Sequence, residues 1–276
     1  NYHYTAVILF NKRLFGFKRQ SLIDLIGHRK LMNLNYSLSF SIRLQILLIC
    51  ALFPLVVHPI SIKADQNNNN LPFDLVSEGW QEIVFQDKKS NEYSACGRGC
   101  IRVVSQSSVS MVGRRFPTAL TSTSVLSWSW KVLKPVPLSD ITSKGRDDRA
   151  LALYITFPYD PETASLTEKL LRPAVELIEG KKAAGRMLSY IWVGHGNPGD
   201  LYQSPFYGEV NAMIIKRNAS DPLDKWLNEQ VNVVEDYQKA FGSKPKEILE
   251  LLIGADTDDL AGSSIGLVKN LSINSE

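Results

Sequence analysis

The sequence predicts an all-β protein, an antiparallel sandwich or barrel with one inserted helix. Two observations favour this fold class. Most of the chain beyond Leu71 alternates apolar and polar residues with a period of two, as strands with one buried face do. The alternating segments are short and are separated by Gly, Pro, Asn and Asp, which are typical of the turns that join antiparallel strands.

Seven segments carry the strand pattern: 100–106, 126–132, 151–157, 188–193, 209–217, 247–254 and 264–273. The clearest is 126–132. One face holds Leu126, Trp128, Trp130 and Val132, and the other holds Ser127, Ser129 and Lys131. Two tryptophans in one strand could form an exposed platform for a sugar. A strand with a single apolar face turns that face inward in a sandwich, so the pattern favours a core position for both tryptophans.

Segment 165–180 breaks the β pattern and predicts a helix, within an insertion spanning about residues 163–182. Ser165 precedes Glu168 by three positions, the spacing of a capping box, and Gly180 is a typical helix end. The leucines recur at roughly helical spacing, which predicts one stripe packed on the sandwich. Pro173 is expected to kink or divide the helix. A lid over a cleft is an alternative role, but a plain insertion is favoured.

A second, shorter helix is predicted over residues 235–242, where the chain reads EDYQKAFG. Gly242 is expected to end it.

Residues 32–64 have the composition of a secretory signal peptide. Met32 is the only methionine before position 111, Arg43 precedes an apolar run over 44–57, and Ala64 offers a small residue for cleavage. The alternative is a retained membrane anchor, but about 14 apolar residues fall short of the roughly 20 that span a bilayer. We therefore expect an exported protein, periplasmic or extracellular, and we interpret residues 1–31 as upstream translation without a fold.

The expected organisation after cleavage is an Asn-rich spacer over 65–72 and a single domain over 73–276. The whole chain has 31 Lys and Arg against 28 Asp and Glu, and residues 1–64 contain eight of those basic residues and one acidic residue. The remaining chain therefore has 23 basic and 27 acidic residues. This balance, with no basic patch, argues against a nucleic-acid partner. No membrane span is expected after residue 64.

Of the three cysteines, Cys50 lies in the leader, and Cys96 and Cys100 remain as an even pair. In an exported protein these two predict a disulfide across a turn made by Gly97 and Gly99. Two free thiols are the alternative. A zinc site is poorly supported because the chain has no second Cys or His cluster.

Two groups of carboxylates lie at the ends of predicted strands. They are Asp147 and Asp148, and Asp256, Asp258 and Asp259. Three interpretations are open. Their oxygens suit a structural Ca²⁺, although the sequence is not an EF-hand. They could instead cap loops by accepting backbone N–H bonds, with Arg146 or Arg149 pairing with them, and this is favoured. The third is a catalytic acid/base pair, since a glycosidase uses two carboxylates facing one bond.

His195 lies in a Gly-rich loop after the strand 188–193 and could act as a general base or ligand. Aromatic side chains near that loop could stack on a sugar ring. The candidates for ligand binding are Trp192, His195, Tyr202 and Tyr207. The segment 262–266 matches G-x-S-x-G, but a strand follows Ser264 where a nucleophile elbow needs a helix, so we interpret the match as accidental.

Several segments occur together in the order and spacing of a known family. They are WSWKV, KGRDDRALALYITF, LSYIW, GNPGDLYQSPF, VVEDYQKAFGSKP and LLIGADTDD. Over about residues 73–273 the chain resembles the exported bacterial proteins grouped as domain of unknown function 3047. The resemblance implies a secreted or periplasmic β-sandwich and brings no established activity. Its general look is similar to jelly-roll, galactose-binding-like modules, which is an analogy of fold and not evidence of sugar binding.

Two functions from different classes follow. The favoured one is an exported, non-catalytic β-sandwich protein that binds a glycan or another cell-envelope component through its end loops. The alternative is a carbohydrate-active hydrolase or lyase that uses Asp148 or Asp256 with His195. A protein partner is a third possibility, which a large exposed apolar patch would indicate.

Overall fold

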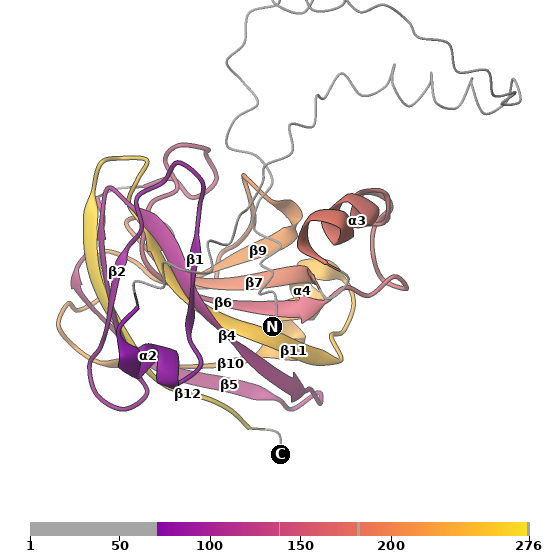
Figure 1. The fold of residues 1–276 in the computed structure, drawn as a ribbon, viewed down its shortest axis with the longest axis horizontal. Helices are drawn as coiled ribbons and strands as arrows, with labels where there is room; N and C mark the ends of the chain where they lie inside the picture. The colour runs from indigo at the N-terminus through magenta and orange to yellow at the C-terminus, as the bar shows by residue number, and fades with distance from the viewer. Residues whose placement is uncertain (1–70, 138, 181–182, 275–276) are drawn as a thin grey trace, which may run out of the picture. The chain divides into compact units, whose positions relative to one another are not determined.

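The computed structural model describes residues 71–137, 139–180 and 183–274 (Figure 1). The helices are α2 (Phe73–Ser77), α3 (Leu166–Glu179) and α4 (Val233–Phe241). The first strands are β1 (Gln81–Val84), β2 (Glu92–Ala95), β3 (Cys100–Gln106), β4 (Val109–Ala119), β5 (Val125–Lys134) and β6 (Arg149–Pro158). They are followed by β7 (Ala184–Val193), β8 (Leu201–Ser204), β9 (Gly208–Arg217), β10 (Leu227–Asn232), β11 (Glu247–Asp256) and β12 (Ser263–Asn274).

The strands of the described residues form two sheets. The large sheet has seven strands in the order β1-β4-β11-β6-β7-β9-β8, and the small sheet has five in the order β10-β5-β12-β3-β2. Neighbouring strands are antiparallel, apart from the parallel pair of β7 and β9. The predicted fold class, an antiparallel β-sandwich or jelly roll with an inserted helix, is confirmed.

The main hydrophobic core lies between the two sheets. Leu126 and Trp130 of β5 meet residues of the large sheet there, such as Leu153 and Tyr190, and all four are almost fully buried. A second apolar cluster, which includes Ala152, Tyr154, Met213 and Ile215, lies on the opposite face of the large sheet. The central strands of the large sheet are therefore buried on both faces, which explains why β7 is buried along its whole length.

The helix α3 begins at the predicted capping box. Ser165 N donates to the Glu168 carboxylate at 2.7 Å, and Glu168 N donates to Ser165 Oγ at 3.1 Å. Pro173 was predicted to kink or divide the helix. It does not divide it, because one helix runs through Pro173, and the kink stays a prediction. The second predicted helix is confirmed as α4. It starts two residues earlier than expected, with Asn232 accepting from Val234 N and Glu235 N.

The predicted orientation of α3 is wrong. Its side chains Leu166, Leu170 and Leu177 are 86, 65 and 87 % exposed, whereas Glu168 and Arg172 are buried. The reason is the charge on β7, where the buried Arg186 donates to both oxygens of Glu168 at 2.8 Å. A buried cation needs an anionic partner, so the polar side of α3 faces the sandwich.

The predicted signal segment 32–64, the segment 1–31 and residues 65–70 of the predicted spacer lie outside the described residues. Within the described part of the chain, no helix has both the length and the apolar character to cross a membrane.

Candidate functional site

The two predicted carboxylate groups lie together at one end of the large sheet. Asp256 ends β11 directly opposite Arg149, the first residue of β6. The Arg149 guanidinium donates to Asp256 at 2.8 Å and to Asp147 at 3.2 Å. Both carboxylates are buried. Arg149 is therefore the positive charge that bridges the two groups, as the capping interpretation allowed.

Asp148 and Asp258 have structural partners in the same region. The two oxygens of Asp148 accept from Asp259 N at 3.1 Å and from Leu260 N at 3.2 Å, so this side chain holds the loop after β11 in place. Asp258 forms an ion pair with Lys88. The capping interpretation is confirmed for Asp148.

A metal role for these carboxylates gains no support from the geometry. Within residues 71–137, 139–180 and 183–274, no group of three or more His, Cys, Asp or Glu side chains is arranged to hold a metal ion. The predicted Ca²⁺ site at Asp147, Asp148, Asp256, Asp258 and Asp259 stays a prediction. The guanidinium of Arg149 already neutralises part of the charge that a cation would meet.

Burial raises the pKa of two of the carboxyls. The pKa of Asp147 is raised to about 7, chiefly by burial, with Arg149 opposing the rise and the neighbouring Asp259 and Asp256 adding to it. The pKa of Asp148 is raised to about 6 by burial and by Asp256, against the backbone N–H bonds that it accepts. Both groups therefore hold protons in the folded chain at a pH at which the unfolded chain has lost them.

These pKa shifts predict that Asp147 and Asp148 stabilise the folded chain more in mild acid than at neutral pH. Both carboxyls have an ordinary pKa of 3.8, so between pH 4 and about 7 the folded chain binds more protons than the unfolded chain. The free energy of unfolding should fall as the pH rises through that window, by up to about 1.4 kcal/mol per pH unit for each proton. Urea titrations from pH 4.5 to 8 measure this slope. The Asp147→Asn variant should flatten it, and an unchanged slope would contradict the assignment.

The predicted end-loop ligand site is contradicted for Trp192. This side chain is 0 % exposed, and its indole N–H donates to Asn218 O at 3.1 Å, because its strand turns it toward the core. His195 is exposed, and Tyr202 and Tyr207 are partly buried against the second apolar cluster. In the described part of the chain, no hydrogen bond or ion pair joins His195 to Asp148 or Asp256.

The structure around the G-x-S-x-G match at residues 262–266 agrees with the interpretation that the match is accidental. Ser264 lies inside β12 and is fully buried, with no helix after it. It is not placed as a nucleophile.

The tryptophans of β5 belong to the core, as predicted. Trp128 and Trp130 are 1 and 0 % exposed, and their rings meet edge to face with centroids 5.5 Å apart. Trp128 also contacts Tyr190, and Trp130 contacts Trp192, both on β7 of the large sheet. These four rings join the two sheets.

The opposite side of the same strand faces a polar groove of about 480 Å³. Its lining comes from β5, β10 and β12: Ser127, Trp128, Ser129, Asn228, Glu229, Gln230, Asn270 and Ser272. Within it, Ser129 Oγ donates to Asn228 Oδ1 at 2.7 Å and accepts from Asn270 Nδ2 at 3.2 Å. We call this surface the serine groove. The strand pairing explains it, since Asn228 lies opposite Ser129 and Gln230 opposite Ser127.

A partly exposed aromatic ring precedes β10 on this sheet. Trp226 immediately precedes Leu227, which pairs with Trp130, and its ring lies 5.4 Å from Lys131 Nζ and 4.0 Å from Lys269 Nζ. Lys131 also pairs with Asp224 at 2.9 Å. Lys269 lies opposite Ser129, so the lysine is next to the groove. Trp226 was not among the site residues predicted from the sequence, although the polar alternation of Asn228 and Gln230 after it was a usable signal.

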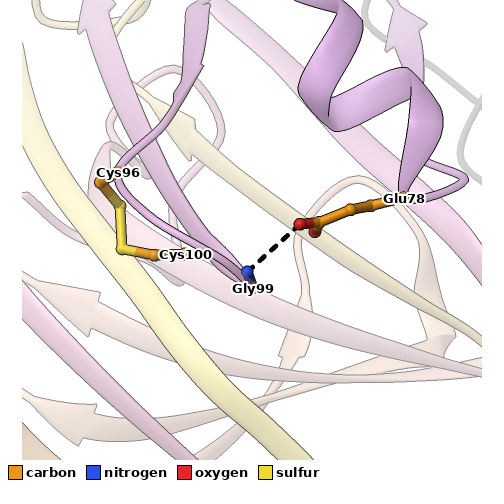
Figure 2. The surroundings of a disulfide bond; sticks show 4 residues. All are labelled: Glu78, Cys96, Gly99 and Cys100. Atoms are coloured by element: carbon orange, nitrogen blue, oxygen red, sulfur yellow. Dashed lines mark hydrogen bonds between the residues drawn. A yellow bond between two sulfur atoms is a disulfide. The ribbon is translucent and has the colours of Figure 1, made fainter.

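The predicted disulfide between Cys96 and Cys100 is confirmed (Figure 2). It closes the turn between β2 and β3, in which Gly97 and Gly99 have positive φ, as expected for glycines in a tight turn. The turn is tied to the residue after α2, because Gly99 N donates to the Glu78 carboxylate at 3.2 Å.

Comparisons with known proteins give a family and several distant structures. The xyloglucanase domain of NopAA, a type three effector from Sinorhizobium fredii, is 12 % identical with a TM-score of 0.37, over 72 % of this chain and 95 % of that one. Endoglucanase cel12A from Rhodothermus marinus is 11 % identical with a TM-score of 0.41, over 74 and 94 % of the two chains. Likenesses at this level establish no common function.

A search of curated proteins finds no match. A family model does match, over residues 78–272, which is most of the chain and includes both the carboxylate cluster and the serine groove. The protein belongs to the family described as protein of unknown function (DUF3047).

Proposed function

We propose that this protein is an exported, non-catalytic glycan-binding protein and that the serine groove is its binding site. The observation that carries the proposal is an open groove of about 480 Å³ with hydroxyl and amide side chains on its floor and a partly exposed tryptophan beside it. Sites for small ligands are commonly 300–1,000 Å³ in volume. The groove is within that range.

The chemistry of the lining suits a sugar. Ser, Asn and Gln side chains each donate and accept hydrogen bonds, as the hydroxyl groups of a sugar do. Ser127 and Ser129 are small, so a flat ligand can approach the sheet closely. Trp226 offers an aromatic face next to polar groups, a combination enriched where one side of a contact is apolar and the other wet.

The proposed site has no pair of catalytic carboxylates. The only acidic residue in its lining is Glu229, which accepts from Trp130 Nε1 at 3.0 Å and from Arg217 Nε at 2.6 Å. A glycosidase needs two carboxyl groups facing one bond, about 5–9.5 Å apart. The alternative, a hydrolase or lyase using Asp148, Asp256 and His195, is weakened because both carboxylates have structural partners.

Export is supported by the disulfide. A bond between Cys96 and Cys100 persists in an oxidising compartment and is rare in the cytosol. It agrees with the signal peptide expected over residues 32–64, and a glycan of the cell envelope or of the surroundings is then within reach.

Binding of the purified protein to an immobilised panel of bacterial and plant glycans tests the proposal. At least one glycan should bind without release of new reducing ends. Trp226→Ala should weaken that binding by roughly tenfold or more, because aromatic anchors carry much of the energy at such sites. Phe73→Ala, at a residue 82 % exposed on α2 and outside the groove lining, is the matched control and should bind normally.

Three outcomes of this experiment oppose the proposal. Absence of binding to every glycan would overturn it. Equal binding by Trp226→Ala would remove the groove as the site. Release of products would favour the hydrolase or lyase. Each measurement is run in Ca²⁺ and again in chelator, so that a metal requirement, if present, is assigned to the carboxylate cluster by the Asp256→Asn variant.

A further inference from the structure

A second, smaller pocket opens at the disulfide turn and differs in chemistry from the serine groove. Its volume is about 150 Å³, and it shares only Asn270 with the groove. It is lined by Glu78, Trp80, Arg98, Gly99, Ile101, Arg114, Ile253, Val268, Asn270 and Leu271. These residues come from both sheets, from the segment between α2 and β1, and from the disulfide turn between β2 and β3.

Buried apolar side chains form one part of the pocket. Ile101 of β3 and Val268 of β12 come from the small sheet, and Ile253 of β11 comes from the large sheet, with exposures of 2, 1 and 0 %. All three belong to the main core. The pocket is therefore an opening between the sheets that reaches the apolar interior.

A guanidinium with an unused donor lies at this opening. Arg114 of β4 is stacked near two rings, 4.9 Å from the centroid of Trp80 and 5.6 Å from that of Phe116. Its Nε is buried and has no hydrogen-bond partner among the described residues. Buried donors are nearly always paired in folded proteins, so Arg114 keeps a donor that the described part of its own chain does not satisfy.

The charges around the pocket favour an anion. Arg98 and Arg114 supply two positive charges against the single carboxylate of Glu78. The Glu78 carboxylate already accepts from Gly99 N in the disulfide turn (Figure 2). A carboxylate can accept from two N–H groups of one arginine at once, the strongest geometry for such a pair.

We propose that this pocket binds a small monocarboxylate with an apolar body, its carboxylate on Arg114 and its body against Ile101, Ile253 and Val268. The volume sets the size, since a cavity of about 150 Å³ lined by apolar side chains accommodates benzene in another protein. Benzoate therefore has the expected size and charge. This proposal stands apart from glycan binding in the serine groove.

Calorimetric titration of the full chain with benzoate and with benzamide tests it. Benzamide keeps the size of benzoate and removes the charge. Benzoate should bind at least tenfold more tightly than benzamide, and Arg114→Gln should remove that difference. Arg102→Gln, on strand β3 of the small sheet and outside the pocket lining, should keep it. The Trp80 indole NMR signal should shift with benzoate in the wild-type chain, because its ring lies in the pocket wall.

Several results would overturn the proposal. One is equal binding of benzoate and benzamide, and another is unchanged benzoate binding by a folded Arg114→Gln variant. A third is no benzoate binding to the wild-type chain at about 50 mM, a concentration well above the millimolar dissociation constant that so small a ligand can reach. Circular dichroism of Arg114→Gln shows whether it is folded. If it is not, Arg114→Lys, which keeps the charge but cannot bind bidentately, should retain weakened binding, and unweakened binding would count against the proposal.

Discussion

Replacing Trp130 with alanine should lower the free energy of unfolding by about 3–5 kcal/mol, the usual cost of removing a large buried aromatic side chain. Trp130 is 0 % exposed, and its ring contacts Trp128 and Trp192 with centroids 5.5 and 5.6 Å away. The substitution leaves a cavity between the sheets. It also removes the indole donor from the buried Glu229 carboxylate, which keeps only its ion pairs with Arg217 and Lys216.

Urea titration of Trp130→Ala and of Ser127→Ala measures this cost against a control on the same strand. Ser127 points to the serine groove, so its loss should change the free energy of unfolding by no more than about 0.5 kcal/mol. The comparison then shows that the core face of β5, with Trp130, stabilises the fold and that the groove face, with Ser127, does not. A cost below about 1 kcal/mol for Trp130→Ala would contradict the core assignment.

Replacing Arg149 with leucine should be as damaging, at about 3–5 kcal/mol at pH 8, because it leaves buried carboxylates without their cation. Arg149 donates to Asp147 and Asp256, and both of these carboxylates are buried. Burial and the neighbouring carboxyls already raise the pKa of Asp147 to about 7, with Arg149 opposing them. Without Arg149 that pKa rises further.

The pH dependence of this variant distinguishes an electrostatic cost from a packing cost. At pH 5 the Asp147 carboxyl of the variant is protonated in the folded chain, so part of the lost stability should return. The loss relative to wild type should thus be smaller at pH 5 than at pH 8. Arg146→Leu, at an exposed neighbouring arginine, should have little effect at either pH. An equal loss at both pH values would show that Arg149 acts through packing alone.

Strands with a clear apolar face could be predicted from the sequence, and others could not. Segments 126–132, 151–157 and 247–254 alternate or run apolar, and each lies in an observed strand. The strands β1, β2, β8 and β10 were missed because they are short or polar, and pairing with neighbours holds them in place. β4 was missed because glycine, proline and two arginines interrupt its pattern.

The orientation of α3 shows a second limit. Its leucine spacing indicates an amphipathic helix but not which side meets the sandwich. That choice depends on Arg186, a residue of β7 whose buried guanidinium takes Glu168 as its partner. A contact between segments distant in sequence cannot be read from the helix itself.

The candidate sites divide in the same way. The carboxylates at strand ends could be found from the sequence, and Arg149 was named as a partner, but only the register of β6 against β11 places that arginine opposite Asp256. The serine groove depends on β10 lying beside β5, two strands far apart in the chain. The polar face of the WSWKV strand could be predicted from the sequence, but the strands that lie beside it could not.

The most direct test of the glycan-binding account is the response of the five tryptophan indole N–H signals in NMR spectra while soluble oligosaccharides from the glycan panel are added. Trp128, Trp130 and Trp192 are buried in the core, Trp80 lies in the second pocket, and Trp226 lies beside the serine groove. The account predicts that the Trp226 signal shifts and the other four stay in place. A shift confined to any other tryptophan, or no shift with any glycan, would contradict it.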